Sequence, residues 1–350
     1  MGGTVHLIPE DGIGGVEVAA HALQASPAPS CEVRLMFMAG GPARTDSRAE
    51  YVSPALSVNN PLVWWRALRR LWRERPEVLV CSLWRAVPVG LALKLFRPRT
   101  RLVFFLHLSA HAHLADRLLD APMLLAADAV WADSRATLEA RMGKSRKPSR
   151  VISFVTHAVQ PLSEICDLAP RLVFWGRLNR QKGLDRAIAL VEALVSLGVD
   201  ARFEIWGPDD GEKPLLEKQI QEAGLGKHVR FRGVTRREAL PALAASHCFY
   251  LQLSRMEGMA MSVVEAMQLG LVPVVTPVGE IAGYCRDDEN AIVLEDPGKM
   301  EALAKRLLAL LQDEEGYRRL SRNARKTWEN HPLYSDDFCA ALRELDGDRL

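Results

Sequence analysis

Two glutamates, Glu257 and Glu265, stand eight residues apart around what reads as a strand-to-helix turn. A strand-like run at 248–253 precedes them, and a helical run at 263–269 follows, closed by Gly270. In an open α/β sheet, ligands bind at such turns, and the helix N-terminus offers free N–H groups to phosphate. Because carboxylates bind hydroxyl groups well, this pair is typical of a site for a sugar nucleotide.

Two cations, Arg177 and Lys182, lie five residues apart in segment 174–183, which reads as a strand, a glycine turn and a helix start. A guanidinium grips phosphate oxygens with a planar fork, and an ammonium adds a point charge. In a transfer from a nucleotide diphosphate, both would stabilise the charge that develops on the leaving group. A solvated basic loop is the alternative interpretation.

His107 follows the strand-like run 102–106, so it is predicted at the carboxyl end of a strand, where ligands bind. His111 and His113 are close in sequence and raise the possibility of a metal. No cysteine or carboxylate joins them at an obvious ligand spacing, so we expect no metal site. A lone histidine is often structural, but its position makes His107 the better functional candidate.

The turn that contains Gly12, Gly14 and Gly15 resembles a dinucleotide fingerprint, G-x-G-x-x-G. The third glycine of that pattern is Glu17 here, which cannot provide the close helix–strand packing, so a NAD site is disfavoured. The loop still allows a ligand to approach, and an ordinary βα turn is the alternative.

Residues 61–73 form an amphipathic segment with Leu62, Trp65, Leu68 and Trp72 on one face and arginines on another. Tryptophan and arginine together favour a membrane interface with anionic lipids. The alternative is a helix that covers a sheet and has a solvated basic face.

Strand-like and helical runs alternate twice along the 350 residues, which predicts an α/β protein of two Rossmann-like domains facing each other across a cleft. The predicted domains are 1–160 and 161–350; the resemblance given below implies that the first binds the acceptor and the second the sugar nucleotide. The last helix is expected to pack back on the first domain.

Charge is divided unevenly, with a net +7 over residues 1–160 and −5 over residues 161–350. The basic half suggests an anionic surface or substrate. Six scattered cysteines indicate a reduced protein without disulfides. No apolar run is long enough for a membrane span, and a signal-peptide pattern is lacking. These features predict a cytoplasmic protein that contacts the inner face of the plasma membrane peripherally.

Taken together, these segments resemble the retaining GT-B glycosyltransferases of family 4. The matching segments follow the family's order: 14–17, 106–107, 176–183, 257–265, 270–276 and 278–281. Each segment is moderately specific, and their joint presence in this order is the stronger signal.

The resemblance implies a role for each matching residue in the second domain. Glu265 would bind the ribose, Glu257 the hydroxyls of the donor sugar, and Arg177 with Lys182 the leaving phosphate. The amides of Ala260, Met261 and Ser262 would meet the diphosphate. The family usually has glycine where this chain has Ala260, which puts the identity of the donor in doubt.

The remaining implied contacts lie elsewhere in the chain. His107 would touch the sugar near the reacting carbon, Gly14 and Gly15 would approach the donor, and the loop at Val234 would border the base. The implied reaction moves a hexose to a hydroxyl with retention, without a metal or other cofactor.

The implied acceptor is a glycan or a lipid-linked glycan of a bacterial surface polysaccharide or lipopolysaccharide pathway, and nucleic acid is not an expected partner. Alternatives are a GT-B sugar-nucleotide epimerase and a non-catalytic, two-lobed nucleotide-sugar binding protein. A nucleotide dehydrogenase is less favoured than these alternatives, because Glu17 stands where the dinucleotide fingerprint has its third glycine.

Overall fold

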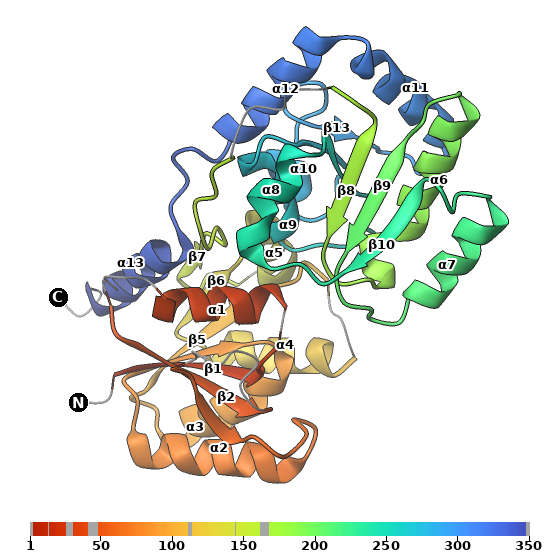
Figure 1. The fold of residues 1–350 in the computed structure, drawn as a ribbon. Helices are drawn as coiled ribbons and strands as arrows, with labels where there is room; N and C mark the ends of the chain where they lie inside the picture. The colour runs from red at the N-terminus through yellow and green to blue at the C-terminus, as the bar shows by residue number, and fades with distance from the viewer. Residues whose placement is uncertain are drawn as a thin grey trace. The chain divides into compact units, whose positions relative to one another are not determined.

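The chain divides into two compact units, seen in a computed structural model that describes residues 3–12, 14–25, 31–40, 48–110, 114–143, 145–161 and 168–347. One unit comprises Met1–His157 and Pro332–Leu350, and the other comprises Ala158–His331 (Figure 1). The change of unit after residue 157 lies three residues before the predicted boundary at 160. The C-terminal segment belongs to the first unit.

Within its described residues, the first unit contains a seven-stranded parallel sheet in the order β3-β2-β1-β4-β5-β6-β7. The strands are β1 (Thr4–Glu10), β2 (Val33–Ala39), β3 (Glu50–Ser53), β4 (Val78–Ser82), β5 (Arg101–Leu106), β6 (Ala129–Ala132) and β7 (Ser149–Val151). The helices are α1 (Gly15–Ala25), α2 (Pro61–Glu74), α3 (Val87–Phe96), α4 (Leu114–Ala126), α5 (Arg135–Met142) and α13 (Tyr334–Gly347), with a 3-10 turn η1 (Trp84–Ala86).

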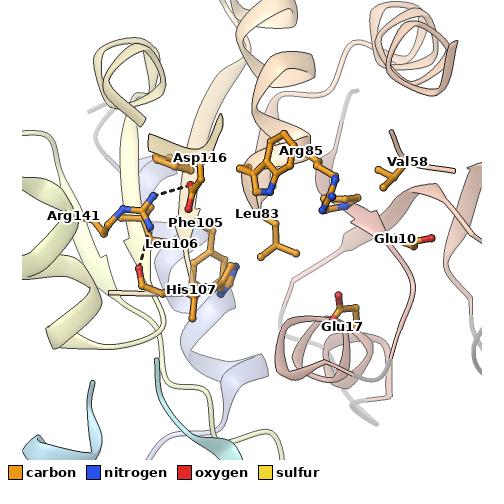
Figure 2. Close-up of a pocket in the computed structure, with 14 residues that line it drawn as sticks. Glu10, Glu17, Val58, Leu83, Arg85, Phe105, Leu106, His107, Asp116 and Arg141 are labelled. Atoms are coloured by element: carbon orange, nitrogen blue, oxygen red, sulfur yellow. Dashed lines mark hydrogen bonds and ion pairs between the residues drawn. The ribbon is translucent and has the colours of Figure 1, made fainter. Parts of the chain in front are cut away.

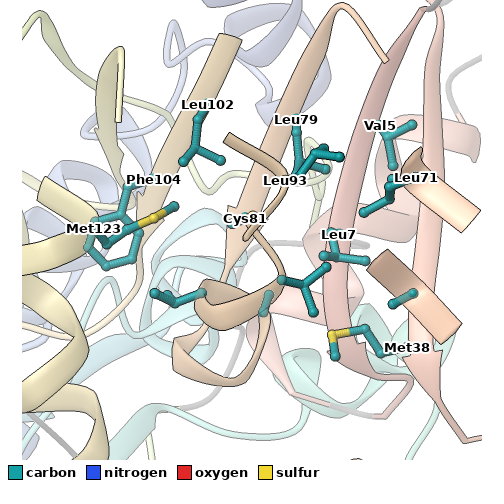
Figure 3. Close-up of a cluster of buried hydrophobic side chains, with 14 of the residues drawn as sticks. Val5, Leu7, Met38, Leu71, Leu79, Cys81, Leu93, Leu102, Phe104 and Met123 are labelled. Carbon is teal, nitrogen blue, oxygen red and sulfur yellow. The ribbon is translucent and has the colours of Figure 1, made fainter. Parts of the chain in front are cut away.

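Side chains of each strand alternate between the two faces of this sheet. Val5 and Leu7 of β1 join the main core with residues of α2, α3 and α4 (Figure 3). Their neighbour Ile8 packs on the other face, in a cluster that includes Ala20 of α1. His6 lies two residues before Ile8 in β1, so the polar side chain of His6 is on the same face of the sheet as Ile8 and α1.

Helix α2 buries a different face from the one that the sequence suggests. Its side chains in the core are Val63, Ala67 and Leu71, each 0% exposed. Trp65 and Trp72, which the pattern assigns to the apolar face, are 53% and 39% exposed. Small and branched residues fit against the sheet, and the large aromatic rings remain on the surface.

Helix α13 returns the chain to the first unit through apolar and covalent contacts. Phe338 is fully buried and its ring centroid lies 5.0 Å from that of Trp131. Cys339 forms a disulfide with Cys31 across a sequence separation of 308 residues. The prediction of a protein without disulfides was wrong, because the spacing of these cysteines in sequence gives no sign that α13 brings them together.

The described part of the second unit contains a six-stranded parallel sheet in the order β10-β9-β8-β11-β12-β13. The strands are β8 (Arg171–Trp175), β9 (Arg202–Trp206), β10 (Val229–Gly233), β11 (Phe249–Gln252), β12 (Val272–Val275) and β13 (Ile292–Val293). The helices are α6 (Leu184–Ser196), α7 (Lys213–Glu222), α8 (Leu240–Ala245), α9 (Met261–Gln268), α10 (Ile281–Tyr284), α11 (Met300–Leu311) and α12 (Glu314–Lys326), with 3-10 turns η2 (Arg180–Lys182) and η3 (Arg237–Ala239). Among the described residues of both units, none of the helices has the length and hydropathy that a membrane span requires.

Helix α9 begins after a residue in the left-handed conformation, since Ala260 has φ 56° and ψ 63°. The left-handed region costs an L-residue roughly 1–2 kcal/mol because Cβ approaches the next carbonyl oxygen. Ala260 is also 6% exposed, so its methyl group is buried. The position where the family usually has glycine therefore has a glycine-like backbone here.

We expect Ala260→Gly to change the free energy of unfolding by less than about 1 kcal/mol. Relief of the left-handed strain offsets the roughly 0.4–1 kcal/mol that glycine adds to unfolded-chain entropy and the ~0.8 kcal/mol of a buried methyl group. Urea titration followed by circular dichroism measures the change.

The matched control is Ala266→Gly, because Ala266 lies within α9 and is 0% exposed. At that position the lower helix propensity of glycine and the lost methyl group both destabilise the protein, so the free energy of unfolding should fall by about 2 kcal/mol. Equal losses at the two positions would contradict the strained backbone at Ala260.

The disulfide predicts that the denatured, unreduced protein shows two fewer reactive thiols than its six cysteines. Thiol titration in denaturant, with and without prior reduction, measures this difference. The variant Cys339→Ser should leave Cys31 reactive and remove the linked peptide seen by mass spectrometry. All cysteines reactive in the unreduced wild type would disprove the bond.

Candidate active site

Glu257 is a buried carboxylate in the loop between β11 and α9, with its side chain 5% exposed. Lys182 Nζ lies 2.8 and 3.0 Å from its two carboxylate oxygens. Ser254 Oγ donates to Oε1 at 2.6 Å, and Gln252 Nε2 donates to the same atom at 3.0 Å. A desolvated carboxylate is tolerated when it is paired and hydrogen-bonded in this way.

Two glycines let the backbone approach this ion pair closely. Gly183, directly after Lys182, has φ +65°, and a Cβ there would lie 1.9 Å from the carbonyl oxygen of Leu253. Gly279 has φ +58°, and its Cβ would lie 2.2 Å from the carbonyl oxygen of Glu257. Any other residue at either position would displace the loop that carries Glu257.

Glu265 lies in α9 and binds two groups that the sequence analysis did not select. The indole Nε1 of Trp175 donates to its Oε2 at 3.0 Å. The guanidinium of Arg237, in η3, forms an ion pair with its Oε1. Arg237 lies four residues after Gly233, close to the predicted loop at Val234. This closeness in sequence is the signal that could have identified it.

The start of α9 has backbone N–H groups that precede the first intrahelical hydrogen bonds. The amides of Val263 and Val264 are the first to bond back, both to the carbonyl oxygen of Ala260. The amides of Met261 and Ser262 therefore precede the first intrahelical bond, where N–H groups and the helix dipole favour a phosphate. The Ser262 hydroxyl donates to Gln252 Oε1 at 2.8 Å, which links α9 to the environment of Glu257.

Arg177 and Val234 lie at exposed positions of the second unit. The Arg177 side chain is 45% exposed and forms an ion pair with Asp210 at 3.1 Å. Among the described residues, its ion pair is thus with an aspartate and not with Glu257 or Glu265. Val234 is 69% exposed. In the second unit, Lys182 and the two glutamates are therefore held by ion pairs and hydrogen bonds in the interior, whereas Arg177 and Val234 are exposed.

His107 of the first unit lies directly after β5 and is 8% exposed. Its Nε2 lies 2.9 Å from Ser82 Oγ. Burial lowers the pKa of His107 well below 6.5, and the neighbouring His6 lowers it further. His107 is therefore neutral at physiological pH and suits hydrogen bonding rather than proton storage. His111 and His113 lie outside the described residues.

His107 lines a cavity of about 260 Å³ within the first unit (Figure 2). Other lining side chains are Glu10, Glu17, Trp84, Arg85, Asp116 and Arg141. Leu83, also in the wall, has φ 65° and ψ 149°, a region that residues other than glycine rarely adopt. Strained backbone of this kind is concentrated at functional sites.

The predicted glycine loop borders this cavity through Glu17. Gly14 precedes α1 and Gly15 is the first residue of the helix. The Glu17 carboxylate lies against Gly14, where a Cβ would be 2.4 Å from Oε2. The loop and His107 thus contribute to one site in the first unit, whereas Lys182, Glu257 and Glu265 contribute to a site in the second.

Two curated relatives illustrate the similarity in sequence. The GDP-mannose:cellobiosyl-diphosphopolyprenol alpha-mannosyltransferase of Xanthomonas oryzae pv. oryzae is 30% identical over 140 residues, which are 40% of this chain and 37% of that protein. The lipopolysaccharide core biosynthesis mannosyltransferase LpsB of Rhizobium meliloti is 26% identical over 287 residues, 75% of this chain and 78% of LpsB. The first match thus spans well under half of its relative.

Solved structures match the whole fold. HepE of Anabaena superposes with a TM-score of 0.81 at 18% identity, over 99% of this chain and 100% of HepE. Sucrose-phosphate synthase of Thermosynechococcus elongatus gives a TM-score of 0.75 at 16% identity, with the same coverage. Residues 165–327 match the family described as glycosyl transferases group 1. Over residues 165–327 the chain therefore resembles the group 1 glycosyltransferases, and it has the GT-B fold of two Rossmann-like domains.

Proposed function

We propose that this protein is a glycosyltransferase that moves a hexose from a nucleotide-diphosphate sugar to an acceptor hydroxyl, with retention at the anomeric carbon. The observation that carries the proposal is the buried pair of Lys182 and Glu257 beside the start of α9. A cation, a carboxylate and free helix amides together match a phosphate joined to a sugar.

Each group of the second unit receives one part of the donor. Glu257 binds hydroxyls of the hexose, and Glu265 binds the ribose, held in place by Trp175 and Arg237. The amides at the start of α9, from Ala260 to Ser262, bind the diphosphate. Val234 borders the base, on an exposed loop that is able to adapt to it.

The reaction breaks the bond between C1 and the phosphate oxygen and forms a bond from C1 to the acceptor oxygen on the same face. The acceptor proton passes to the leaving phosphate. Lys182 stabilises the charge on that phosphate, and Arg177 joins it after leaving Asp210, so no metal ion is required. His107 is neutral and its Nε2 is hydrogen-bonded to Ser82, which leaves Nδ1 for contact with a sugar near C1.

Relatives and neighbours support this class of donor. One relative is named for GDP-mannose, and the HepE structures were determined with UDP and glucose and with UDP-glucose. Val234, which is proposed to border the base, has no side-chain donor that could select one base. We therefore propose a nucleotide-diphosphate hexose as donor. The turnover measurements with UDP-, GDP- and dTDP-linked hexoses described below identify the base.

The cavity beside His107 is the proposed acceptor site. Glu10 and Glu17 contribute carboxylates to its wall, while Arg141 is already paired with Asp116 and Asp120. This balance of charge suits the hydroxyls of a neutral sugar better than a phosphate. Names of relatives such as the lipopolysaccharide mannosyltransferase favour a glycan of bacterial surface polysaccharide or glycolipid synthesis.

The exposed face of α2 is proposed to contact an anionic membrane at the cytoplasmic side. Trp65 and Trp72 lie on the surface with Phe96 of α3, whose ring centroid is 5.6 Å from that of Trp72. Arg69 stacks over Trp65 at 5.2 Å and Arg97 over Trp72 at 4.6 Å. Aromatic rings with adjacent arginines match the interfacial region of a bilayer.

The variant Lys182→Met is expected to lower kcat by roughly 10²–10³-fold, as removal of a preorganised charge at a reacting phosphate does. Glu257→Gln is also expected to lower turnover, because it breaks the ion pair that positions Lys182 and weakens the contact with the hexose hydroxyls. Turnover is measured with UDP-, GDP- and dTDP-linked hexoses and a glycan acceptor, and the product anomer is assigned by NMR. Wild-type turnover in both variants, or an inverted product, would overturn the proposal.

Breaking a buried ion pair also costs about 3–5 kcal/mol of stability, so the folded fraction of each variant is measured by circular dichroism. The matched control is Lys213→Met, since the Lys213 side chain is 42% exposed and pairs with Glu217 at 3.6 Å. It should keep wild-type activity and stability.

Replacing Arg66, Arg69 and Arg73 with glutamine is expected to weaken binding to anionic vesicles by about 100-fold at low salt. Each arginine near an anionic surface contributes about 1 kcal/mol, and all three are exposed on α2. Vesicle sedimentation measures the partition coefficient.

The control replaces three exposed arginines of the second unit, Arg230, Arg286 and Arg322, with glutamine. This variant has the same change in net charge and should retain binding. Equal loss in both triple variants would show a diffuse charge effect, and no binding by the wild type would reject the membrane contact.

A further inference from the structure

Three polar side chains form a row beneath the cavity of the first unit. His6 lies on β1, Ser82 at the end of β4 and His107 after β5, and these three strands are neighbours in the sheet. The register pairs His6 with Val80 and Ser82 with Phe105, so the row advances two residues at each strand and stays on one face. His6 and Ser82 are each 0% exposed.

The Ser82 hydroxyl joins both imidazoles. Its Oγ lies 2.8 Å from His6 Nε2 and 2.9 Å from His107 Nε2. A neutral imidazole has one N–H and one bare nitrogen, and a serine has one O–H proton. Burial lowers the pKa of His6 to about 3, and the pKa of His107 is also lowered, so both rings are neutral.

With one hydroxyl proton, Ser82 donates to one histidine and accepts from the other, which leaves two arrangements. If Ser82 donates to His6, the proton of His6 is on Nδ1. If Ser82 donates to His107, His6 donates through Nε2 and its Nδ1 is a bare acceptor. The two arrangements give His107 opposite tautomers.

The surroundings of His6 distinguish these arrangements. Its ring packs against Phe105 and Phe338, with centroid distances of 6.2 and 5.5 Å. Among the described residues, no partner reaches its buried Nδ1. An orphaned buried N–H is rarer in proteins than an acceptor that lacks a donor. Each arrangement leaves one buried Nδ1–H without a partner in the described residues, on His6 or on His107. His107 lines the cavity and His6 does not, so only at His107 is a ligand oxygen able to accept that proton. The proton of His6 is therefore assigned to Nε2, where Ser82 accepts it.

We propose that His6 and Ser82 are positioning residues that hold His107 as its Nδ1–H tautomer, with Nδ1–H as a hydrogen-bond donor for a sugar oxygen. The relay runs from His6 Nε2–H to Ser82 Oγ, and from Ser82 Oγ–H to His107 Nε2. His107 lines the cavity, and within the described residues its buried Nδ1 has no partner. Only the identity of the ligand as a sugar rests on the proposed function.

This assignment adds a specific property to the cavity. Nδ1–H donates to a ligand oxygen, whereas the other tautomer would accept from a ligand hydroxyl. Because His6 and Ser82 lie behind His107 in the sheet, they act on the ligand only through the ring of His107. Their effect must therefore appear in the protonation pattern of His107 as well as in turnover.

Long-range ¹⁵N–¹H NMR of histidine-labelled wild-type protein tests the proposal directly. The spectrum of His107→Asn identifies the His107 signals, and that of His6→Gln identifies the His6 signals. His247 is an internal reference for an Nδ1–H ring, because its Nδ1 lies 2.8 Å from the carbonyl oxygen of Leu243. We expect Nδ1–H for His107 and Nε2–H for His6, and the reverse pattern would overturn the proposal.

Two substitutions of His6 then separate positioning from packing. His6→Gln retains an amide donor close to Nε2, and should keep the His107 tautomer and most of kcat/KM. His6→Phe removes the donor, and should mix the tautomers of His107 and lower kcat/KM by about tenfold. An unchanged His107 tautomer in His6→Phe would count against the relay.

The wild-type spectrum decides the tautomer even where a variant does not fold. It also separates the two proposals, because it needs no turnover. If His107 shows Nδ1–H and no nucleotide sugar is consumed, the relay stands and the proposed function fails. If turnover is found with His107 protonated on Nε2, the function stands and the relay is wrong.

Discussion

The ion pair of Lys182 and Glu257 is the constraint around which the second unit's site is organised. It joins the turn after β8 to the loop after β11, which are neighbouring strands of the sheet. A carboxylate this deeply buried requires several donors, and Gln252, Ser254 and Lys182 supply them. Close backbone approach follows from this requirement, which explains why Gly183 and Gly279 lie where a Cβ has no space.

The first unit also positions polar side chains at the ends of neighbouring strands, but it does so without an ion pair. Its row of His6, Ser82 and His107 also occupies neighbouring strand ends, but burial keeps both rings neutral. In the proposed mechanism, a neutral donor next to a sugar orients the substrate without attracting the phosphate. The charged groups proposed to act on the leaving group lie in the second unit, so the proposal assigns orientation and charge stabilisation to different parts of the chain.

Local patterns predicted much of this fold. The strand-like run 102–106 lies within β5, and the helical run 263–269 overlaps α9. Edge strands β3 and β7 were missed because they are short, and α4 was missed because Pro122 interrupts its pattern. The glutamates and Lys182 were selected because chemically active side chains and a turn lie together in sequence, and their roles stay predictions. Arg237, Trp175 and Ser82 were not found, because distant segments bring them to the site.

The return of α13 makes the second unit an insertion within the first. Residues 158–331 are one continuous stretch, whereas the first unit is assembled from both ends of the chain and fastened by Cys31 and Cys339. Residues 31–339 therefore form a covalent ring closed by the disulfide bond, and the whole second unit is part of this ring. A protease that cuts one loop of that unit opens the ring without releasing a fragment, and a C-terminal truncation at residue 331 removes part of the first unit's core rather than a dispensable tail.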